Sequence, residues 1–259
     1  MIALRKGVFG MLNNNELERY DRQIIMRGFG REGQEKLKQA KAFIAGCGGL
    51  GSPITIYLAE AGIGTLRIVD QDTIDTSNLN RQILHWDADV SKSKVESANT
   101  KLSKMNSNIK IEALRETIDE NNVYELTEGC DFIMDAMDNL ATRFLLNTAA
   151  IKHNIPYFHG AVHGLEGRIL TIIPGETACI RCIYRGDIPR EKFPVLGVTP
   201  GVVGCLQATE AIKYLTGIGK LLTDRLLVYD GLGMKFLELS VKRDPECPHC
   251  GHIPFKQEE

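Results

Sequence analysis

A glycine cluster near the start of the chain constrains its fold more than any other feature. Residues 46–51 read Gly-Cys-Gly-Gly-Leu-Gly; they follow a short apolar strand at 41–46 and precede a helix at 52–61. A G-x-G-x-x-G pattern in this setting forms a tight turn and lets the backbone approach a phosphate at a helix start, where free N–H groups point outward. The predicted nucleotide-binding residues of this loop are Gly46, Gly48, Gly49 and Gly51.

Strands and helices alternate through the first part of the chain. Further strands are expected at 65–70, 109–114 and 130–138, with helices at 16–40, from an N-cap at Ser91, and at 142–153. The second half adds a strand pair at 157–164 and 167–175, a helix at 202–216, and strands at 226–231 and 235–241. This order predicts an α/β protein with a Rossmann-like, doubly wound, mostly parallel sheet that later antiparallel strands extend. We expect a single domain over residues 1–259, with an N-terminal helical segment at 15–40.

Polar side chains after the second strand favour phosphate chemistry. Asp70 ends that strand nineteen residues after Gly51, where a carboxylate can accept hydrogen bonds from ribose hydroxyls. Two cations follow, and they suit a triphosphate better than a nicotinamide because they can neutralise its oxygens. The candidates in this stretch are Asn78, Arg81, Gln82 and Lys94. Taken singly, a surface arginine such as Arg81 is more often a solvated charge than a functional one.

Asp138 follows the fourth strand. The carboxyl ends of parallel strands are where open α/β sheets bind their ligands, and a carboxylate there can hold Mg²⁺ on phosphate oxygens. The alternative interpretation of Asp138 is an N-cap for the helix that follows. Asp135, nearer the middle of the strand, is expected to be buried structure.

Two C-x-x-C pairs account for four of the seven cysteines. Two such knuckles can supply four thiolates to one tetrahedral Zn²⁺, and this predicts a structural zinc site formed by knuckles at 179–182 and 247–250. The predicted ligands are Cys179, Cys182, Cys247 and Cys250. His249 and His252 are expected to be bystanders, because four sulfur atoms fill the coordination shell. The alternative is two unrelated pairs, one of them redox-active.

The composition excludes several functional classes. Hydrophobic residues make up 43% of the chain, charged residues 25%, and the formal net charge is −2, so no general attraction to nucleic acid or anionic lipid is expected. No apolar run reaches the roughly 18 residues that a membrane helix needs. The first residues lack a signal-peptide pattern, and the odd number of cysteines argues against a disulfide framework. A cytoplasmic protein is the resulting expectation.

Taken together, these motifs resemble the MoeB/ThiF/HesA adenylyltransferases, relatives of the ubiquitin-activating enzymes. The resemblance runs from residue 18 to residue 251 and rests on RYDRQIIMRGFGREGQEKL, AGCGGLGS, VDQDTIDTSNLNRQ, the K-V-E-S-A helix start, MDNLATR and the two C-x-x-C pairs. It implies that MgATP binds on the glycine loop and that a small ubiquitin-fold carrier protein ending in Gly-Gly docks nearby. The terminal carboxylate of the carrier then attacks the α-phosphate, which gives an acyl-adenylate and pyrophosphate.

The resemblance also implies roles for matching residues of this chain. Asp70 would hold the ribose and Asp138 the Mg²⁺, while Arg81 and Lys94 would stabilise the phosphates. Arg22, in the R-Y-D-R-Q motif, would reach the phosphates of the other subunit in a homodimer. Asn78 and Gln82 would support this set. No general base is required, because the attacking carboxylate is already ionised at neutral pH.

One departure from the family concerns a cysteine. Several relatives use a cysteine in the loop after the first C-x-x-C for a covalent link to the carrier, but residues 184–204 contain none here. Cys205, at the expected start of the next helix, lies beyond the usual place and is most simply a core residue. Adenylation is therefore expected to need no enzyme thiol.

Three alternative functions stay open. An NAD(P)-dependent oxidoreductase would need only the glycine loop and Asp70, and would leave Arg22, Arg81 and Lys94 unexplained. A non-catalytic binding subunit with the same fold would not need the retained charges. A tRNA-modifying dehydratase of the same superfamily would also adenylate a carboxylate, although the full set of paired cysteines disfavours it. The carrier and its pathway, whether molybdopterin, thiamine, tRNA thiolation or cysteine synthesis, are not specified by these motifs.

Overall fold

Eight strands form one sheet in the computed structural model of the chain, which describes residues 11–185 and 193–254. The strands are β1 (Lys41–Ala45), β2 (Thr65–Val69), β3 (Lys110–Leu114), β4 (Phe132–Asp135), β5 (Tyr157–His163), β6 (Glu166–Ile172), β7 (Arg225–Asp230) and β8 (Lys235–Ser240). Their order across the sheet is β3-β2-β1-β4-β5-β6-β7-β8. The pairs from β3 to β5 are parallel and those from β5 to β8 are antiparallel, so the predicted mostly parallel sheet with an antiparallel extension is confirmed.

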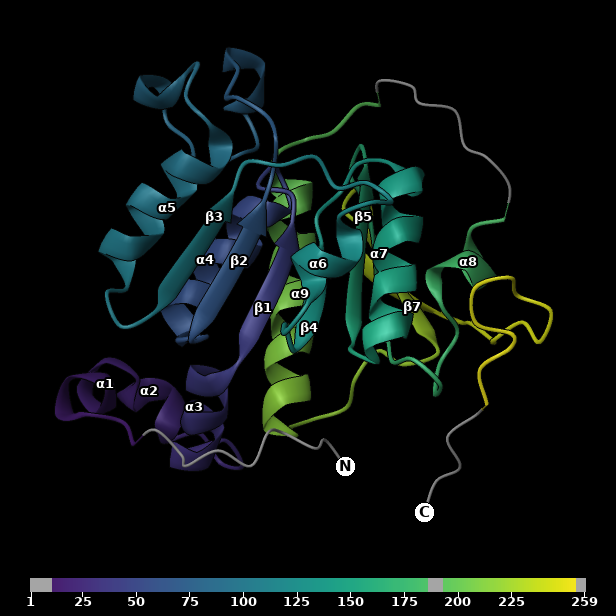
Figure 1. Ribbon diagram of the computed structural model, residues 1–259, viewed down its shortest axis with the longest axis horizontal. Coiled ribbons are helices and arrows are strands. Elements are labelled where there is room, and N and C mark those ends of the chain that lie inside the picture. The colour runs from purple at the N-terminus through teal and green to yellow at the C-terminus, as the bar shows by residue number, and fades with distance from the viewer. Residues whose placement is uncertain (1–10, 186–192, 255–259) are drawn as a thin grey trace.

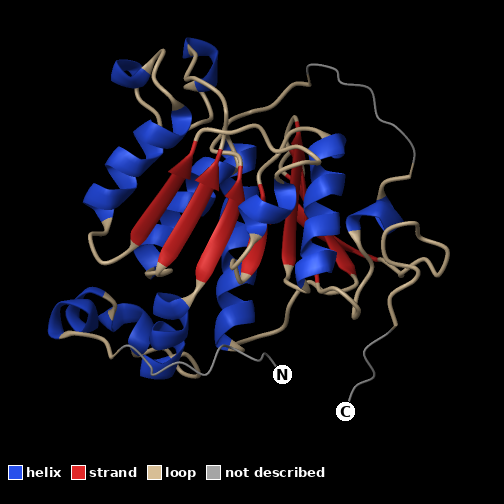
Figure 2. Ribbon diagram, viewed as in Figure 1, coloured by secondary structure: helices blue, strands red, loops and turns tan. Residues whose placement is uncertain are grey.

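Helices cover both faces of the sheet (Figures 1 and 2). The helices of the described residues are α1 (Asn14–Arg19), α2 (Asp21–Ile24), α3 (Gly30–Gln39), α4 (Gly51–Ala61), α5 (Lys94–Met105), α6 (Val123–Thr127), α7 (Leu140–His153), α8 (Ile180–Ile183) and α9 (Val198–Thr216), of which α1 and α2 lie beyond the end of the sheet rather than on a face. Apolar residues of α3, α4, α5 and α9 pack with Ile44, Leu66 and Met134 on one face. Residues of α6, α7 and α8 pack with Phe43, Val69 and Ile133 on the other. Alternate residues of the central strands therefore enter opposite cores, as a doubly wound sheet requires.

The glycine loop lies where the parallel strands end. Figure 2 shows the arrowheads of β1, β2 and β3 at one edge of the sheet, while α1, α2 and α3 lie at the other edge. The strand register brings the ends of three strands level with one another, because Ala45, the last residue of β1, is opposite both Val69, the last of β2, and Asp135, the last of β4. The loops after β1, β2 and β4 consequently lie next to one another, and this arrangement positions the candidate site.

Several predicted elements differ in detail. The segment predicted as one helix at 16–40 forms α1, α2 and α3, and Gly28, at φ +86°, lies in the break before α3. Ser91 is not an N-cap, because its backbone is left-handed (φ +72°) and its N–H donates to the carbonyl of Ile74; α5 follows Ser93 instead. Helix α9 begins at Val198, four residues before the predicted start. In the described residues, no helix is long and apolar enough to cross a membrane.

Candidate active site

The glycine loop after β1 can be built only with glycine at its two ends. Gly46 has φ +96°, and a Cβ atom there would lie 2.9 Å from the carbonyl oxygen of Ala136. A Cβ atom at Gly51 would lie 2.1 Å from the carbonyl oxygen of Gly46, closer than any real contact. Gly48 and Gly49 are different, since their nearest neighbours would be 3.4 Å away. The outer glycines therefore shape the turn, and the inner two leave its surface bare for a ligand.

Asp70 ties this loop to the end of β2. Its Oδ2 atom accepts the N–H of Cys47 at 2.8 Å and its Oδ1 atom accepts the N–H of Asp72 at 2.9 Å. Lys94, at the start of α5 and only 6% exposed, lies 2.8 Å from Asp72 Oδ2 and 3.9 Å from Asp70 Oδ2. The ammonium group is thereby held beside the glycine loop. Each carboxylate oxygen has two lone pairs, so Asp70 keeps acceptor capacity for hydroxyl groups.

The segment after β2 brings amide and guanidinium groups to the same loop. Asn78 Oδ1 accepts the N–H of Asp75 at 3.2 Å, which closes a single 3₁₀ turn at Thr76–Asn78. Arg81 Nη1 donates to the carbonyl of Ser77 at 2.8 Å. Its Cγ atom would lie 3.6 Å from a Cβ atom at Gly49. Arg81 therefore lies against Gly49, one of the two inner glycines of the loop.

Gln82 carries an unsatisfied polar atom at this place. It is 5% exposed, its Oε1 atom is buried with no hydrogen-bond partner, and its Nε2 atom would lie 3.4 Å from a Cβ atom at Gly48. A buried polar atom without a partner is uncommon, because desolvation costs about 1–3 kcal/mol. The amide nitrogen of Gln82 is thus the atom beside Gly48, while its orphaned oxygen is an acceptor that a hydrogen-bond donor, such as a ligand hydroxyl group, would complete.

Asp138 is exposed at the end of β4, one strand away from the glycine loop. The N-cap of α7 is Asn139, whose Oδ1 atom accepts the N–H of Thr142 at 2.9 Å. The alternative role of Asp138 as an N-cap is therefore wrong. Its carboxylate makes one long contact, 3.4 Å to Asn139 Nδ2, and is free to bind a cation.

Arg22 lies at the opposite edge of the sheet from the other site residues of its own chain. It is exposed in α2, and the neighbouring Gln23 donates to the carbonyl of Ala61 at the end of α4. The glycine loop is at the start of the same 11-residue helix, about 16 Å away along its axis. The single chain therefore does not bring Arg22 to the site, and Figure 1 shows its helix, α2, at the opposite end of the sheet from the loops after β1 and β2.

The four paired cysteines meet on the face of the sheet covered by α7. The Sγ–Sγ distances are 4.0 Å for Cys179–Cys182, 3.7 Å for Cys179–Cys247 and 3.5 Å for Cys182–Cys250. All four sulfur atoms lie within 4.8 Å of one another and all four residues are buried. A tetrahedral zinc with Zn–S bonds of about 2.3 Å separates its sulfur atoms by about 3.8 Å, so the cluster fits this ion.

The contacts around the cluster match a closed structural site. The backbone N–H of Asp244 donates to Cys182 Sγ at 3.4 Å. His249 does not join the sulfur atoms but lies 3.1 Å from Asn147 Nδ2 through its Nδ1 atom. Asn147 Oδ1 in turn accepts the N–H of Ile180 at 3.2 Å. The knuckles thus attach the C-terminal segment to α7 and α8.

With this geometry established, comparisons with known proteins identify the family. The model of the ThiF family matches residues 20–249. The chain belongs to the ThiF family. It is 42% identical over 246 residues to the SAMP-activating enzyme E1 of Haloferax volcanii, covering 93% of this chain and 91% of that protein. It is 39% identical over 254 residues to the sulfur carrier protein adenylyltransferase of Thermus thermophilus, covering 94% of each.

Solved structures of ThiF-like enzymes have the same fold. E. coli MccB with ATP superposes with a TM-score of 0.81 at 26% identity and covers 92% of this chain and 75% of that one. MccB with the peptide MccA-N7isoASN gives a TM-score of 0.83 at 26% identity, with coverages of 94% and 77%. The names of these relatives favour an adenylyltransferase over the oxidoreductase and dehydratase alternatives.

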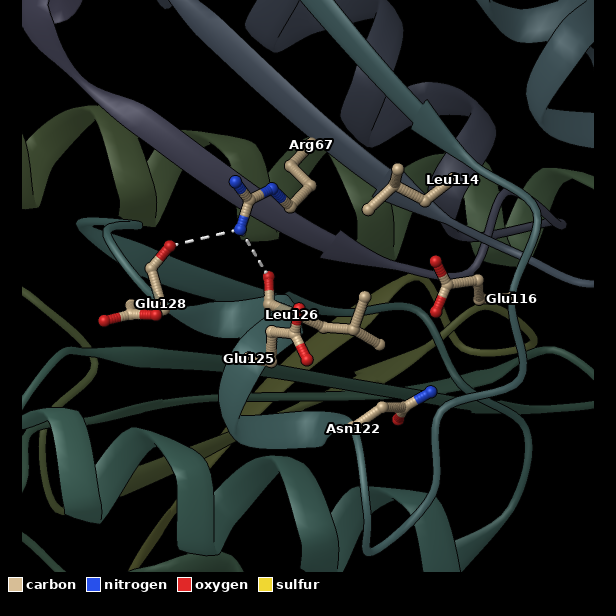
Figure 3. A pocket seen from close by; sticks show the side chains of 7 residues that line it. All are labelled: Arg67, Leu114, Glu116, Asn122, Glu125, Leu126 and Glu128. Atoms are coloured by element: carbon tan, nitrogen blue, oxygen red, sulfur yellow. Dashed lines mark hydrogen bonds between the residues drawn. The ribbon is translucent and has the colours of Figure 1, made fainter.

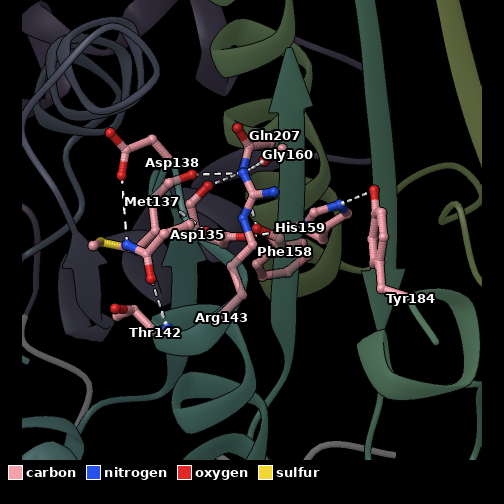
Figure 4. A network of polar contacts seen from close by, with 11 residues as sticks. Asp135, Met137, Asp138, Thr142, Arg143, Phe158, His159, Gly160, Tyr184 and Gln207 are labelled. Atoms are coloured by element: carbon pink, nitrogen blue, oxygen red, sulfur yellow. Dashed lines mark hydrogen bonds and ion pairs between the residues drawn. The ribbon is translucent and has the colours of Figure 1, made fainter. Parts of the chain in front are cut away.

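A buried polar network beneath Asp138 was not found by sequence reasoning. Figure 4 shows Asp135, Arg143 and His159 together under the loop that carries Asp138. Asp135 and His159 are completely buried. The sequence predicted burial for Asp135 and made no prediction for His159. A histidine among the apolar residues of a central strand was the one available signal. In the folded chain it contacts Asp135 of β4 and Tyr184 after α8, and Asp135 is paired in turn with Arg143 of α7.

The cysteines outside the cluster are poorly placed for nucleophilic catalysis. Cys47 and Cys130 are buried; burial raises the pKa of the Cys47 thiol and, despite Arg67 and Lys41 nearby, that of Cys130 to about 11. Cys205 lies inside α9 rather than at its start, and burial raises its pKa too. Residues 186–192 of the loop predicted to lack a thiol lie outside the described residues.

A separate pocket of about 370 Å³ lies between strands β2 and β3 on one side and α6 on the other (Figure 3). Arg67 crosses it and donates to the carbonyls of Leu126 and Glu128 at 2.7 and 3.1 Å. None of the predicted site residues lines this pocket. It is therefore distinct from the site at the glycine loop.

Proposed function

We propose that this protein uses ATP to adenylate the C-terminal glycine carboxylate of a small ubiquitin-fold sulfur-carrier protein. The observation that carries the proposal is the convergence of Asp70, Arg81, Gln82 and Lys94 on a bare glycine loop at one sheet edge, with Asp138 on the next strand. The names of the Haloferax and Thermus relatives, and the ATP in the MccB structure, support the choice of substrate class.

The nucleotide would lie across the glycine loop. Backbone N–H groups at the start of α4 would contact its phosphates, while Asp70 would accept hydrogen bonds from ribose hydroxyls. Lys94 and Arg81 would neutralise charge on the phosphate oxygens, with Asn78 and Gln82 in support. Asp138 would hold Mg²⁺ on these oxygens, since its carboxylate is exposed and free of strong partners.

The reaction needs no proton transfer. A carboxylate oxygen of the carrier attacks the α-phosphorus, the bond to the bridging oxygen breaks, and pyrophosphate leaves with that electron pair. The attacking carboxylate is already ionised near pH 7, since its pKa is about 3.5. The contribution of the protein is therefore to align the two reactants and to stabilise charge that moves onto the phosphates.

The protein partner and the homodimer have separate support. Apolar side chains are exposed on the β7–β8 hairpin at Leu232 and Met234 in the turn, at Leu237 and Leu239 on one face of β8 and at Phe236 on the other, and exposed apolar residues in such number are typical of a protein-binding surface. The carrier would dock on this antiparallel end of the sheet. Arg22, at the far edge from its own site, would complete the site of a second subunit. A homodimer would then hold two composite sites.

The metal and the domain organisation complete the proposal. The four cysteines would hold a structural Zn²⁺, because four sulfur ligands leave no open coordination position for catalysis. A single adenylation domain over residues 1–259 is supported by the continuous eight-stranded sheet and by the contact of both knuckles with the same face.

Pyrophosphate exchange tests the activity. The purified protein with Mg²⁺ is expected to exchange labelled pyrophosphate into ATP only when a Gly-Gly-ending carrier from the same source is present. Asp138→Ala should abolish this exchange because the phosphate-bound cation loses its ligand, while Asp131→Ala, at the other end of β4, should not. Exchange without any carrier, or full activity of Asp138→Ala, would contradict the proposal.

A further inference from the structure

A line of hydrogen bonds leaves the cysteine cluster and enters the sheet. The short helix α8 has Cys179 as its N-cap and Tyr184 as its C-cap, so Tyr184 comes two residues after Cys182. The hydroxyl oxygen of Tyr184 lies 3.2 Å from His159 Nε2 on β5, and the two rings meet edge to face with centroids 5.5 Å apart. The position of this tyrosine is therefore set by the knuckle on one side and by His159 on the other.

The same histidine continues the line to β4. His159 Nδ1 lies 2.7 Å from Asp135 Oδ2, and both residues are completely buried. Burial lowers the pKa of His159, while Arg143 and His159 outweigh burial and lower the pKa of Asp135. The neutral imidazole consequently donates from Nδ1 to an ionised carboxylate and accepts the tyrosine hydroxyl at Nε2. This is the one tautomer that satisfies both bonds.

Asp135 and Arg143 hold the backbone that carries Asp138. Asp135 Oδ1 accepts the N–H of Met137 at 3.0 Å, and Arg143 Nη2 donates to the Met137 carbonyl at 2.5 Å and to the Gly160 carbonyl at 2.8 Å. Both polar groups of residue 137 are thereby bound to the buried network, directly before Asp138 (Figure 4). The direction in which Asp138 leaves the strand depends on these bonds.

We propose that His159 and Tyr184 are positioning residues that couple the four-cysteine knuckle to the Asp138 loop. When the cluster holds its metal, α8 is fixed and Tyr184 bonds to His159; the histidine then orients Asp135, and Asp135 binds the loop. When the metal is removed, the tyrosine withdraws, the Nε2 acceptor of His159 loses its hydroxyl partner, and the loop loosens. The structural metal thus influences the adenylation site from a distance. Only the link to catalysis rests on the proposed function.

Amide hydrogen exchange of Met137, measured by NMR, tests this coupling without ATP or carrier. In the wild type, removing zinc with a chelator should speed exchange of this amide by about fivefold or more relative to amides of β2. In Tyr184→Phe, which keeps the ring and loses the hydroxyl, exchange should already be faster and zinc removal should add less than about twofold. Tyr214→Phe is the matched control, since this tyrosine contacts Phe158 on the same sheet through its ring. It should behave as the wild type does.

Variants of His159 provide a second, independent test, because the proposal predicts the order of their Met137 amide exchange rates. The side-chain amide of His159→Asn can replace the Nδ1 donor to Asp135 but cannot reach Tyr184, so this variant should match Tyr184→Phe. His159→Ala loses both bonds and should exchange faster still. If metal removal unfolds the chain, the zinc-loaded Tyr184→Phe and His159→Asn proteins decide alone: Met137 exchange equal to that of the wild type would overturn the proposal. So would an equal response to zinc removal in the wild type and in Tyr184→Phe.

A kinetic split connects the coupling to the reaction. In zinc-loaded Tyr184→Phe, the Mg²⁺ concentration that gives half-maximal pyrophosphate exchange should rise by about threefold or more, while KM for the carrier stays within about twofold. A change in carrier KM alone would assign Tyr184 to docking and overturn its positioning role. The amide hydrogen exchange of Met137 is measured without ATP or carrier. Failure of this proposal is therefore distinguishable from failure of the proposed function.

Discussion

Two alanine substitutions in the glycine loop should separate ligand binding from folding. At Gly48 a new Cβ atom would meet Gln82 Nε2 at 3.4 Å, an ordinary contact that requires little movement. At Gly51 it would lie 2.1 Å from the carbonyl oxygen of Gly46, so the backbone must shift by about 1 Å. Gly48→Ala should therefore fold normally and bind nucleotide poorly, while Gly51→Ala should lose stability as well.

The magnitudes follow from these contacts. If the methyl group of Gly48→Ala blocks one charge-assisted hydrogen bond to a phosphate, about 1.5–3 kcal/mol of binding is lost and KM for ATP rises roughly 10- to 150-fold. The overlap in Gly51→Ala should cost about 3 kcal/mol of folding free energy, or roughly 6–12 °C in Tm for a chain of this size. Pyrophosphate exchange and thermal unfolding measure the two effects on the same samples.

Gly201→Ala is the matched control. A Cβ atom at this position of α9 would meet no atom within 4 Å, so the substitution should leave activity unchanged and raise stability by about 0.5–1 kcal/mol. The reasoning about the loop is refuted if Gly48→Ala keeps the KM of the wild type for ATP, since the backbone would then not approach the phosphates. A normal Tm for Gly51→Ala would refute the packing argument.

Four further predictions concern the metal, the dimer, the remaining thiol and pH. Cys182→Ala should lower zinc content and Tm together, because metal binding and local folding are linked; metal analysis that finds no zinc in the native protein would contradict this. Arg22→Ala and Lys94→Ala protomers, mixed under verified subunit exchange, should recover activity, since one site of the mixed dimer then has both groups; no recovery would remove Arg22 from the partner's site. Cys205→Ala should keep carrier-dependent exchange within about tenfold, or about 1.4 kcal/mol of barrier, and a reducible adduct with the carrier that disappears in this variant would show the opposite. Burial opposes ionisation of Glu112, but Lys110, Lys41 and Arg67 outweigh burial and lower the pKa of this carboxyl group to about 2. The ionised Glu112 therefore contributes its full stabilisation above the pKa of the unfolded chain, near 4.3, and this stabilisation is lost as the pH falls toward 2. The Glu112→Gln variant should accordingly lose less stability than the wild type as the pH falls from about 4.3 to about 2, and thermal unfolding at each pH measures this difference.

Local sequence determined the elements and the chemistry of each segment separately. The strand–glycine–helix order at 41–61 is readable because a phosphate-binding turn needs glycine at fixed positions and apolar residues before it. The alternation of strands and helices likewise follows from hydrophobic periodicity, and it predicted the sheet and its antiparallel extension. Helix boundaries were less accurate, because a serine such as Ser91 is compatible with a cap or with a left-handed turn, and a tertiary hydrogen bond to Ile74 selected the turn.

Contacts between distant segments decided what the sequence left open. Cys182 and Cys250 lie 68 positions apart, and only the packing of α7 and α8 against the sheet brings their sulfur atoms to 3.5 Å. The amide of Gln82 beside Gly48, and the line of hydrogen bonds from Tyr184 through His159 to Asp135, likewise join different segments of the chain. No short-range pattern encodes such partners, because burial and hydrogen bonding between segments depend on where the whole chain places them. The sequence by itself thus determined which groups are available for nucleotide and metal chemistry, and the tertiary structure decided which of them meet.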